Sequence, residues 1–384
     1  MSDNTNRKSQ AERLPAEGPP PGFLDIVPNA ARQGPDAIFH FQDYDLAIVE
    51  FDDLGCCYDR AQMKAVATRI GTASETDMIV VMFVHGWKHK ADGDDKNLMS
   101  FCEVLTKTVD KEREESAKSG HQRRPILGIF VGWRGLSFCD RFGILDNLTF
   151  WDRQRAGYRV STGSVRELFG LLRRYRNRRL DSGGSAVLVI VGHSFGGMIV
   201  YSALAQSLIE AASTPANEVV PRFADLVLLV NPAVEAARYL PVHALVEERM
   251  AENKITKQPP VFICATAKND WATGMAFPAG NLKSLLTESY LDRKERQALI
   301  NTIGHVDWMR THKLSKGTAV DSAYSLDPME ESDTQNPFWV VEASPEIING
   351  HNDIFKPSFL SFVARQIFRH AKHAREGRGK QSAK

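Results

Sequence analysis

The sequence predicts an α/β fold, with a mainly parallel central sheet, helices on both faces of the sheet and an inserted cap. Short runs of aliphatic and β-branched residues, such as 77–84 and 186–191, have the composition of strands that are buried on both faces. Segments with helical spacing separate these runs, and this alternation is typical of parallel strands joined by crossover helices. Histidine, asparagine or aspartate follows several of the runs, as expected where a site forms at the carboxyl edge of such a sheet.

Each strand is predicted where apolar residues run together, and each helix where they recur every three or four positions. Met63, Val66 and Ile70 show the helical spacing clearly. The expected strands, in chain order, span 45–52, 77–84, 125–131, 186–191, 223–230, 261–266 and 338–342. The expected helices span 58–70, 98–118, 164–180, a segment from 197 onward, a segment ending near 252, and 354–370.

One domain is expected over 38–370, between a disordered, proline-rich N-terminal tail at 1–37 and a basic C-terminal tail at 371–384. Two segments are predicted to carry cap elements: 136–160 is polar and aromatic, and 271–336 is long for a connection inside a compact domain. The aromatic residues in these segments either line a cavity for an acyl chain or belong to the core. They are Phe142, Phe150, Trp151, Trp271, Phe277 and Tyr290.

The composition is that of a soluble globular protein of 384 residues, 43% hydrophobic and 25% charged, with a formal net charge of +1. This near-neutral balance argues against nucleic-acid binding as the main role. No apolar run is long enough to span a bilayer, and the N-terminus lacks the apolar core of a signal peptide. Five scattered cysteines favour reduced thiols and a cytoplasmic location, with export without a cleaved signal as the alternative.

Two clusters of arginine and lysine raise the question of contact with an anionic membrane surface. One lies on the helix expected at 164–180 and the other in the C-terminal tail. We expect a solvated helix face and a solubilising tail, and keep peripheral membrane contact as the alternative. The residues are Arg173, Arg174, Arg176, Arg178 and Arg179 on the helix, and Arg369, Lys372, Arg375, Arg378 and Lys380 towards the C-terminus.

Gly192-His193-Ser194-Phe195-Gly196 is a G-x-S-x-G motif between an expected strand and an expected helix. A strand that leads directly into a helix requires a sharp turn, and glycines allow the backbones to pass closely while the serine adopts a strained conformation. The serine oxygen then projects above the sheet at the positive end of the following helix. Ser194 is therefore the candidate nucleophile.

A serine hydroxyl needs a base within hydrogen-bond reach, and the base needs a carboxylate that fixes its tautomer. His351 is the candidate base because it follows the last strand in a loop that precedes a helix. His305 is the rival base, although no clear strand precedes it. Asp270 is the candidate acid, as the first carboxylate after the strand at 261–266, and Glu235 is the second choice. Asp353 lies close to His351 in sequence but is expected to cap the final helix.

A tetrahedral oxyanion needs two hydrogen-bond donors aimed at it. The backbone N–H of Phe195, at the start of the helix, is expected to supply one donor, and the N–H of Trp87 the other. His85 and Gly86 are expected to position the loop that carries Trp87. His85 and His89 are four residues apart, but no acidic partner or third ligand accompanies them, so no metal site is predicted.

These residues together resemble the α/β-hydrolase superfamily, on the G-x-S-x-G motif, His85-Gly86 and Gly350-His351, over 38–370. The order serine, aspartate, histidine is that of the family. The resemblance implies a serine hydrolase of the esterase or lipase type that needs no cofactor and acts on a small-molecule or lipid ester. It does not identify the substrate. The alternatives are an acyltransferase or thioesterase with the same three residues, and a non-catalytic binding protein on a hydrolase fold.

Overall fold

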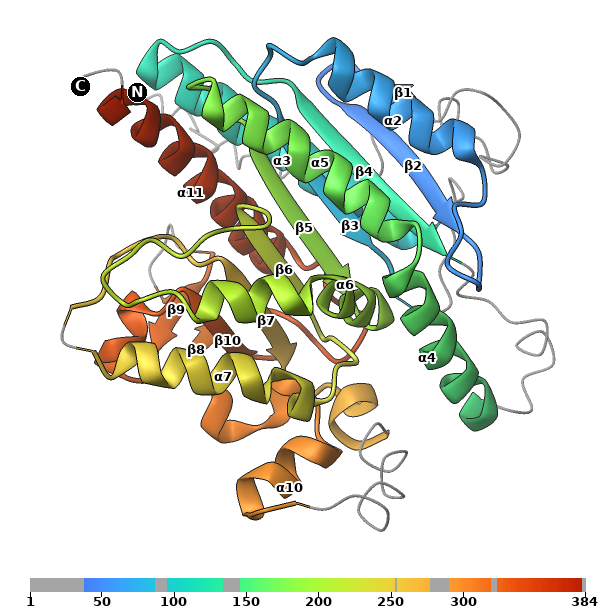
Figure 1. Ribbon diagram of the computed structural model, residues 1–384, viewed down its shortest axis with the longest axis vertical. Helices are drawn as coiled ribbons and strands as arrows, with labels where there is room; N and C mark the ends of the chain where they lie inside the picture. Colours follow the sequence, from blue (N-terminus) through green and yellow to red (C-terminus); the bar gives the residue numbers. More distant parts are fainter. Residues whose placement is uncertain are drawn as a thin grey trace, which may run out of the picture.

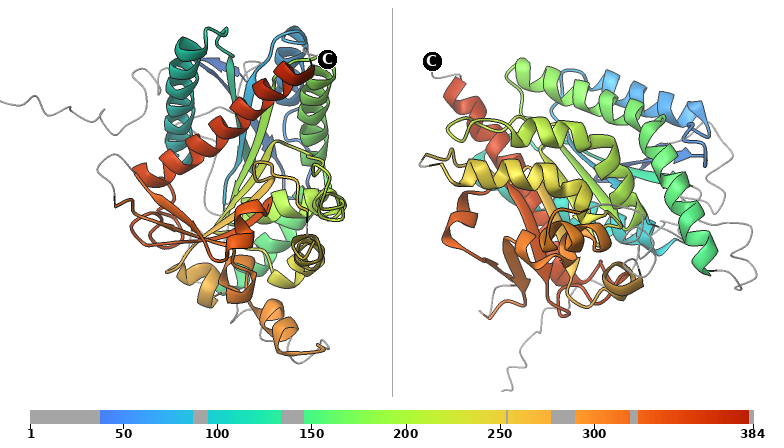
Figure 2. Two further views of the ribbon diagram at one scale, coloured as in Figure 1. Left: turned by 90° about the vertical axis from the view of Figure 1, so that its left-hand side faces the viewer. Right: turned by 60° about the horizontal axis from the view of Figure 1, so that its bottom comes forward.

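The computed structural model describes residues 38–86, 95–133, 146–252, 254–276, 290–318 and 323–381. These residues form one ten-stranded sheet in the order β1-β2-β4-β3-β5-β6-β7-β10-β8-β9, with helices on both faces (Figure 1; Figure 2). The inner strands pair in parallel, and only the outermost pairs, β1–β2 and β8–β9, are antiparallel. The predicted α/β class with a mainly parallel sheet is confirmed.

Every strand predicted from an apolar run is present in the sheet. The strands are β1 Ile38–His40, β2 Asp45–Phe51, β3 Ile79–Val84, β4 Ile126–Trp133, β5 Val187–His193, β6 Leu226–Val230, β7 Phe262–Ala267, β8 His312–Ser315, β9 Ser325–Pro328 and β10 Phe338–Ala343. The strands that the sequence did not predict, β1, β8 and β9, are short and lie at the two edges. Edge strands are partly solvated, so they lack the continuous apolar run that marks a central strand.

Two hydrophobic cores flank the sheet because alternate residues of each strand face opposite sides. In β5, Leu188 and Ile190 belong to one core, and Val187 and Val189 to the other. Helices α2, α4, α5, α6 and α7 pack in the first core, and α3 and α11 in the second. The helices are α2 Arg60–Thr72, α3 Lys96–Ser119, α4 Asp146–Thr162, α5 Val165–Asp181, α6 Phe195–Ala212, α7 Ala236–Met250, α10 Arg293–Ile300 and α11 Pro357–Gln381.

The C-terminal helix is longer than the sequence predicted. The expected helix ended near residue 370 and was followed by a basic tail, but α11 continues to Gln381. Ala371 is fully buried, and Arg375 forms an ion pair of 2.5 Å with the buried carboxylate of Glu112. The ion pair between Arg375 and Glu112 of α3 helps to hold the helix beyond residue 370. Local sequence does not reveal this contact, because the two residues are far apart in the chain.

The two segments predicted to carry a cap have different structures. Within 271–336, the stretch 312–328 contains β8 and β9, which extend the sheet beside β10, so the cap prediction is wrong for that stretch. The described part of 136–160 is α4, in which Gly157 lets the helix approach Met198 of α6. The side chains of Phe142, Phe150, Trp151 and Phe277 lie outside the described residues. Trp271 is 67% exposed and Tyr290 44%, so neither belongs to the core.

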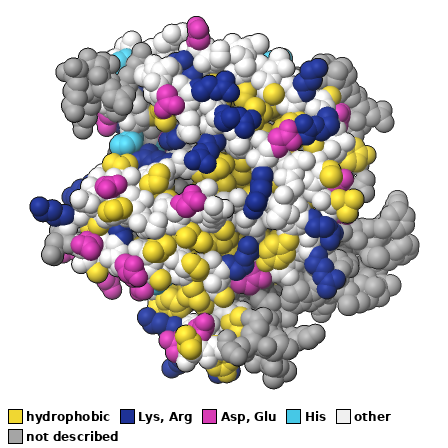
Figure 3. Space-filling view, viewed as in Figure 1, with side chains coloured by type: hydrophobic (Ala, Val, Ile, Leu, Met, Phe, Trp, Pro, Cys, Tyr) yellow, Lys and Arg dark blue, Asp and Glu magenta, His cyan; other side chains and the backbone are white. Residues whose placement is uncertain are grey.

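The basic residues of α5 are largely engaged in contacts with the protein. Figure 3 shows acidic side chains interspersed among the basic ones on this face of the molecule. Arg176 forms two hydrogen bonds, of 2.6 and 2.9 Å, with Asp225, and Arg179 lies 3.0 Å from Asp77. Arg173 stacks over the ring of Phe223. These contacts anchor α5 to the sheet.

One described helix, α6, is apolar enough and long enough to cross a membrane by composition and length alone. In the fold it is a core helix, since 61% of that stretch is buried, and it begins directly after the central strand β5. Its apolar character therefore has a structural explanation in the packing against the sheet.

His370 of α11 is a buried titratable group without a compensating hydrogen bond. Its side chain is 1% exposed, and within the described part of the chain neither ring nitrogen has a hydrogen-bond partner. Burial lowers the pKa of His370 to about 3, with Asp225 opposing the effect and Arg222, Arg369 and His373 adding to it. The folded protein therefore holds this imidazole neutral.

Stability is expected to fall as the pH drops below about 6.5, where the unfolded chain protonates this histidine and the folded chain does not. One such group costs about 1.4 kcal/mol of unfolding free energy per pH unit within that window. Replacing His370 with leucine should flatten the decline of the urea midpoint between pH about 6.5 and about 4. The exposed His121→Leu is the control, and an equally steep decline in His370→Leu would contradict the assignment.

Candidate active site

Ser194 lies at a sharp turn between β5 and α6, as the motif predicts. Its backbone has φ 55° and ψ −121°, a strained conformation for a residue with a side chain. The glycines on either side permit the close packing of this turn. A Cβ at position 196 would lie 2.1 Å from the carbonyl oxygen of Val84, and one at Gly192 would lie 2.7 Å from the carbonyl oxygen of Gly196.

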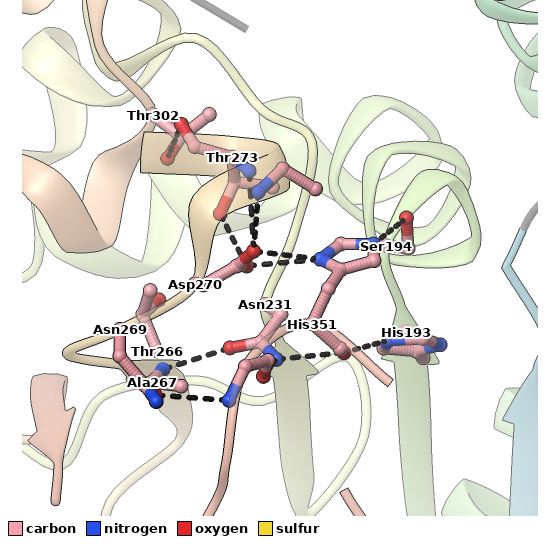
Figure 4. Close-up of polar contacts among 12 residues, drawn as sticks. His193, Ser194, Asn231, Thr266, Ala267, Asn269, Asp270, Thr273, Thr302 and His351 are labelled. Atoms are coloured by element: carbon pink, nitrogen blue, oxygen red, sulfur yellow. Dashed lines mark hydrogen bonds and ion pairs between the residues drawn. The ribbon is translucent and has the colours of Figure 1, made fainter. Parts of the chain in front are cut away.

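Ser194, His351 and Asp270, which are far apart in the sequence, meet at the carboxyl edge of the sheet (Figure 4). Nε2 of His351 lies 2.7 Å from Oγ of Ser194. Nδ1 of the same ring lies 2.9 and 3.1 Å from the two carboxylate oxygens of Asp270. The Asp270 side chain is fully buried, whereas that of His351 is 19% exposed. The ring therefore connects a buried carboxylate to a serine hydroxyl at its other nitrogen.

Asp270 is held as an ionised carboxylate by the donors around it. Burial by itself raises the pKa of Asp270, but hydrogen bonds from His351 and Thr273 and the charge of His351 outweigh it, so the pKa lies below its ordinary value. The backbone N–H groups of Ala272 and Thr273 donate to Oδ1 at 3.0 and 3.2 Å, and the Thr273 hydroxyl donates to Oδ2 at 2.5 Å. These donors belong to the π-helix η2, Ala272–Ala276. They fix the side chain of Asp270, which lies between β7 and this helix.

The loop that carries His351 is fastened through its backbone. Nδ2 of Asn231 donates to the carbonyl oxygens of Gly350 and His351, at 3.1 and 2.9 Å, while Oδ1 accepts the N–H of Ala267 at 2.8 Å. Nε2 of His193 lies 2.9 Å from the His351 carbonyl oxygen, and its ring lies 5.1 Å from the His351 ring. Both side chains hold the histidine loop from neighbouring strands.

His193 was not predicted as a site residue, and Asn231 was expected only as one of the polar residues at the strand ends of this edge, without an assigned role. It follows β6 directly and has a φ of 44°, a left-handed conformation that asparagine tolerates better than most residues. An asparagine at the end of a buried strand is therefore a sign of a sharp turn at this edge. Its contact with the His351 loop depends on strand order, which the sequence does not state.

His85 fixes the start of the loop that follows β3. Its Nε2 accepts the backbone N–H of Trp133 at 3.2 Å, so Nδ1 carries the proton and donates to the carbonyl oxygen of Gly86 at 2.6 Å. The indole N–H of Trp133 donates in return to the carbonyl oxygen of His85 at 2.9 Å. A Cβ at Gly86 would lie 2.9 Å from Cβ of Ser194, so glycine allows this loop to pass beside the serine. Trp87 lies outside the described residues.

The second choices for base and acid occupy other positions. His305 does not contact Ser194; its Nε2 lies 3.1 Å from the hydroxyl of Thr273, on the far side of Asp270 from His351. Glu235 accepts hydrogen bonds from Gln154 at 3.0 Å and from Tyr158 at 3.1 Å. Within the described ranges, no group of three or more histidine, cysteine, aspartate or glutamate side chains is arranged to hold a metal ion.

No protein-family model and no curated protein matches this sequence. Among solved structures, phospholipase PlaB from Legionella pneumophila is similar, at 14% sequence identity and a TM-score of 0.32, over 80% of this chain and 62% of that chain. The complex of the same phospholipase with thio-NAD has 14% sequence identity and a TM-score of 0.32, over 78% of this chain and 61% of that chain. The chain thus spans less than two thirds of the length of these structures. A likeness of this size assigns no family, and the chemistry is inferred from the site itself.

Proposed function

We propose that this protein is a serine hydrolase that cleaves carboxylic esters through an acyl-enzyme on Ser194. The observation that carries the proposal is the position of one imidazole between a serine hydroxyl, at 2.7 Å, and a buried carboxylate, at 2.9 Å. A nucleophile, a base and an orienting acid within hydrogen-bond reach are the requirements for this chemistry. The strained backbone of Ser194 supports the same role, since strain of this kind is typical of functional residues.

In the proposed reaction, Oγ of Ser194 attacks the ester carbonyl carbon while its proton passes to Nε2 of His351. Asp270 holds the proton on Nδ1 and stabilises the imidazolium that forms. The carbon–oxygen bond to the alcohol then breaks, and the alcohol leaves with the proton from Nε2. A water molecule attacks the acyl-enzyme in the same way, and Ser194 recovers its proton as the acid is released.

The negative oxygen of the tetrahedral intermediate requires two backbone donors. Phe195 is the first residue of α6, where N–H groups point away from the helix towards the turn, and we assign its N–H as one donor. We assign the N–H of Trp87 as the other. The residue before it, Gly86, has its carbonyl oxygen held by Nδ1 of His85. His85 would then orient the donor without touching the substrate.

A fluorophosphonate probe, which reacts covalently with activated serines, is expected to label the wild-type protein and not Ser194→Ala. Ser213→Ala is the matched control, since Ser213 is an exposed serine at the other end of α6. Hydrolysis of p-nitrophenyl esters from acetate to palmitate should then show turnover and a preferred chain length. A folded wild-type protein that neither labels nor turns over would contradict the proposal and favour a binding role. Transfer to an added alcohol or amine would indicate an acyltransferase.

A further inference from the structure

A second histidine lies behind Asp270 and reaches it through one hydroxyl. Oγ1 of Thr273 is 2.5 Å from Oδ2 of Asp270 (Figure 4). The same oxygen lies 3.1 Å from Nε2 of His305. A threonine hydroxyl has a single proton, and an ionised carboxylate can only accept. The hydroxyl therefore donates to Asp270 and accepts from His305, whose proton is on Nε2. Ser194 and His305 thus lie at opposite ends of one continuous chain of hydrogen bonds.

The surrounding structure keeps His305 in this position. The ring lies against Gly274, where a Cβ would be 3.0 Å from its Cε1 atom, so glycine leaves room for it. The Thr302 hydroxyl donates to the Thr273 carbonyl oxygen at 3.4 Å and joins the same two segments, which are η2 and the 3-10 helix η4, Ile303–His305. The space beside Gly274 and the hydrogen bond from Thr302 therefore both keep His305 next to Thr273.

His305 faces charges from several elements, and they bear on its protonation. Burial lowers the pKa of His305, and the charge of Arg310 lowers it further. The carboxylates of Asp270, of Glu342 in β10 and of Asp307 in the 3-10 helix η5, Asp307–Met309, raise it. The net effect is a pKa below the ordinary value. At neutral pH the ring is then neutral, which agrees with one proton on Nε2 and its donation to Thr273.

We propose that Thr273 and His305 are positioning residues that fix the orientation of Asp270 and lower the basicity of the Ser194–His351 pair. This inference rests on the proposed function. The Thr273 hydroxyl directs its positive end at Asp270, so it makes the potential at His351 less negative. His305 orients that hydroxyl, and neither residue touches the substrate or the reacting atoms. Loss of the hydroxyl should therefore make His351 easier to protonate and leave one carboxylate oxygen less firmly held.

Thr273→Val, which removes the hydroxyl and keeps the shape, is expected to move the acidic limb of the kcat/KM–pH profile upwards by about half a unit. On the plateau, kcat/KM should fall about fivefold, the loss expected for one hydrogen bond. Thr273→Ser should restore both values because it retains the hydroxyl. Thr108→Val is the control: it removes a buried hydroxyl of α3 that donates to the carbonyl oxygen of Val104 at 2.8 Å, and it should leave the limb in place. An unmoved limb in Thr273→Val would overturn the inference.

His305→Leu removes the donor at the far end of the hydrogen-bond chain. His305→Gln should restore kcat/KM and its acidic limb, because the glutamine amide can place a donor near the position of Nε2. If His305 acts through Thr273, the double variant Thr273→Val/His305→Leu should lose no more than Thr273→Val alone. Additive losses in the double variant would show that His305 acts by another route and would overturn this part of the inference.

A measurement that needs no turnover separates this inference from the proposed function. The proton between Nδ1 of His351 and Asp270 can be followed in the proton NMR spectrum, where His351→Gln identifies its signal. The signal should shift in Thr273→Val and return in Thr273→Ser. If the fluorophosphonate labels Ser194 but the NMR signal does not shift, the proposed role of Thr273 and His305 is wrong and the proposed hydrolase stands. If the signal shifts but the probe never labels the protein, the role of the two residues stands and the proposed hydrolase is contradicted.

Discussion

Replacing Asp270 with asparagine is expected to lower kcat for ester hydrolysis by about 10⁴-fold, the scale of this change in serine–histidine–aspartate sites. The backbone N–H groups of Ala272 and Thr273 both donate to Oδ1, so the asparagine oxygen should take that position. Its NH2 group then occupies the Oδ2 position, 2.9 Å from Nδ1 of His351. The imidazole would have to accept there and carry its proton on Nε2, where it could no longer take the proton of Ser194.

The control for this variant is Asp353→Asn, close to His351 in sequence. Asp353 lies 3.4 Å from Lys356, and its side chain is 49% exposed. It precedes α11, which begins at Pro357, by four residues, so it does not cap that helix as the sequence suggested. We expect Asp353→Asn to retain wild-type kcat. Steady-state kinetics on one ester compares Asp270→Asn with Asp353→Asn. Equal losses in both variants would contradict the assignment of Asp270.

Glu112→Ala is expected to destabilise the protein by about 3–5 kcal/mol, the cost of leaving buried charges without their partner. Glu112 of α3 is fully buried and accepts two hydrogen bonds from the Arg124 guanidinium, at 3.0 and 2.9 Å. It also accepts from Arg375 of α11. Arg124 donates in turn to the carbonyl oxygens of Ser185 and Ala371, both at 3.0 Å. One carboxylate thus joins α3, α11 and the segments that lead into β4 and β5.

The matched comparison is Glu167→Ala, which removes an exposed carboxylate that also makes two hydrogen bonds to one arginine. Arg60 and Glu167 are joined by contacts of 2.7 Å, but their side chains are 63% and 46% exposed. Water replaces the lost partner there, so the urea midpoint should hardly change. Unfolding by urea, followed by circular dichroism, compares the two variants. A small effect of Glu112→Ala would show that the buried arginines find other partners or water.

The central strands and the serine turn could be predicted because their causes are local. A strand buried on both faces needs an unbroken apolar run, and 186–191 is one. The turn after it needs glycines for close approach, and Gly192 and Gly196 supply them. The edge strands β8 and β9 escaped prediction because only their pairing with β10 and with each other defines them. The same holds for the last turns of α11, which depend on a carboxylate of α3.

The sequence by itself determined the central strands, the strained serine turn and a short set of polar residues at strand ends, because each follows from the composition of a few neighbouring residues. Only the tertiary structure decided which of them meet. Since β10 pairs with β7 in parallel, the loops after both strands lie together, and His351 reaches Asp270. His305 comes from a segment without a preceding strand and lies on the other side of the same carboxylate. Strand order is set by the packing of the whole chain, which no local pattern encodes.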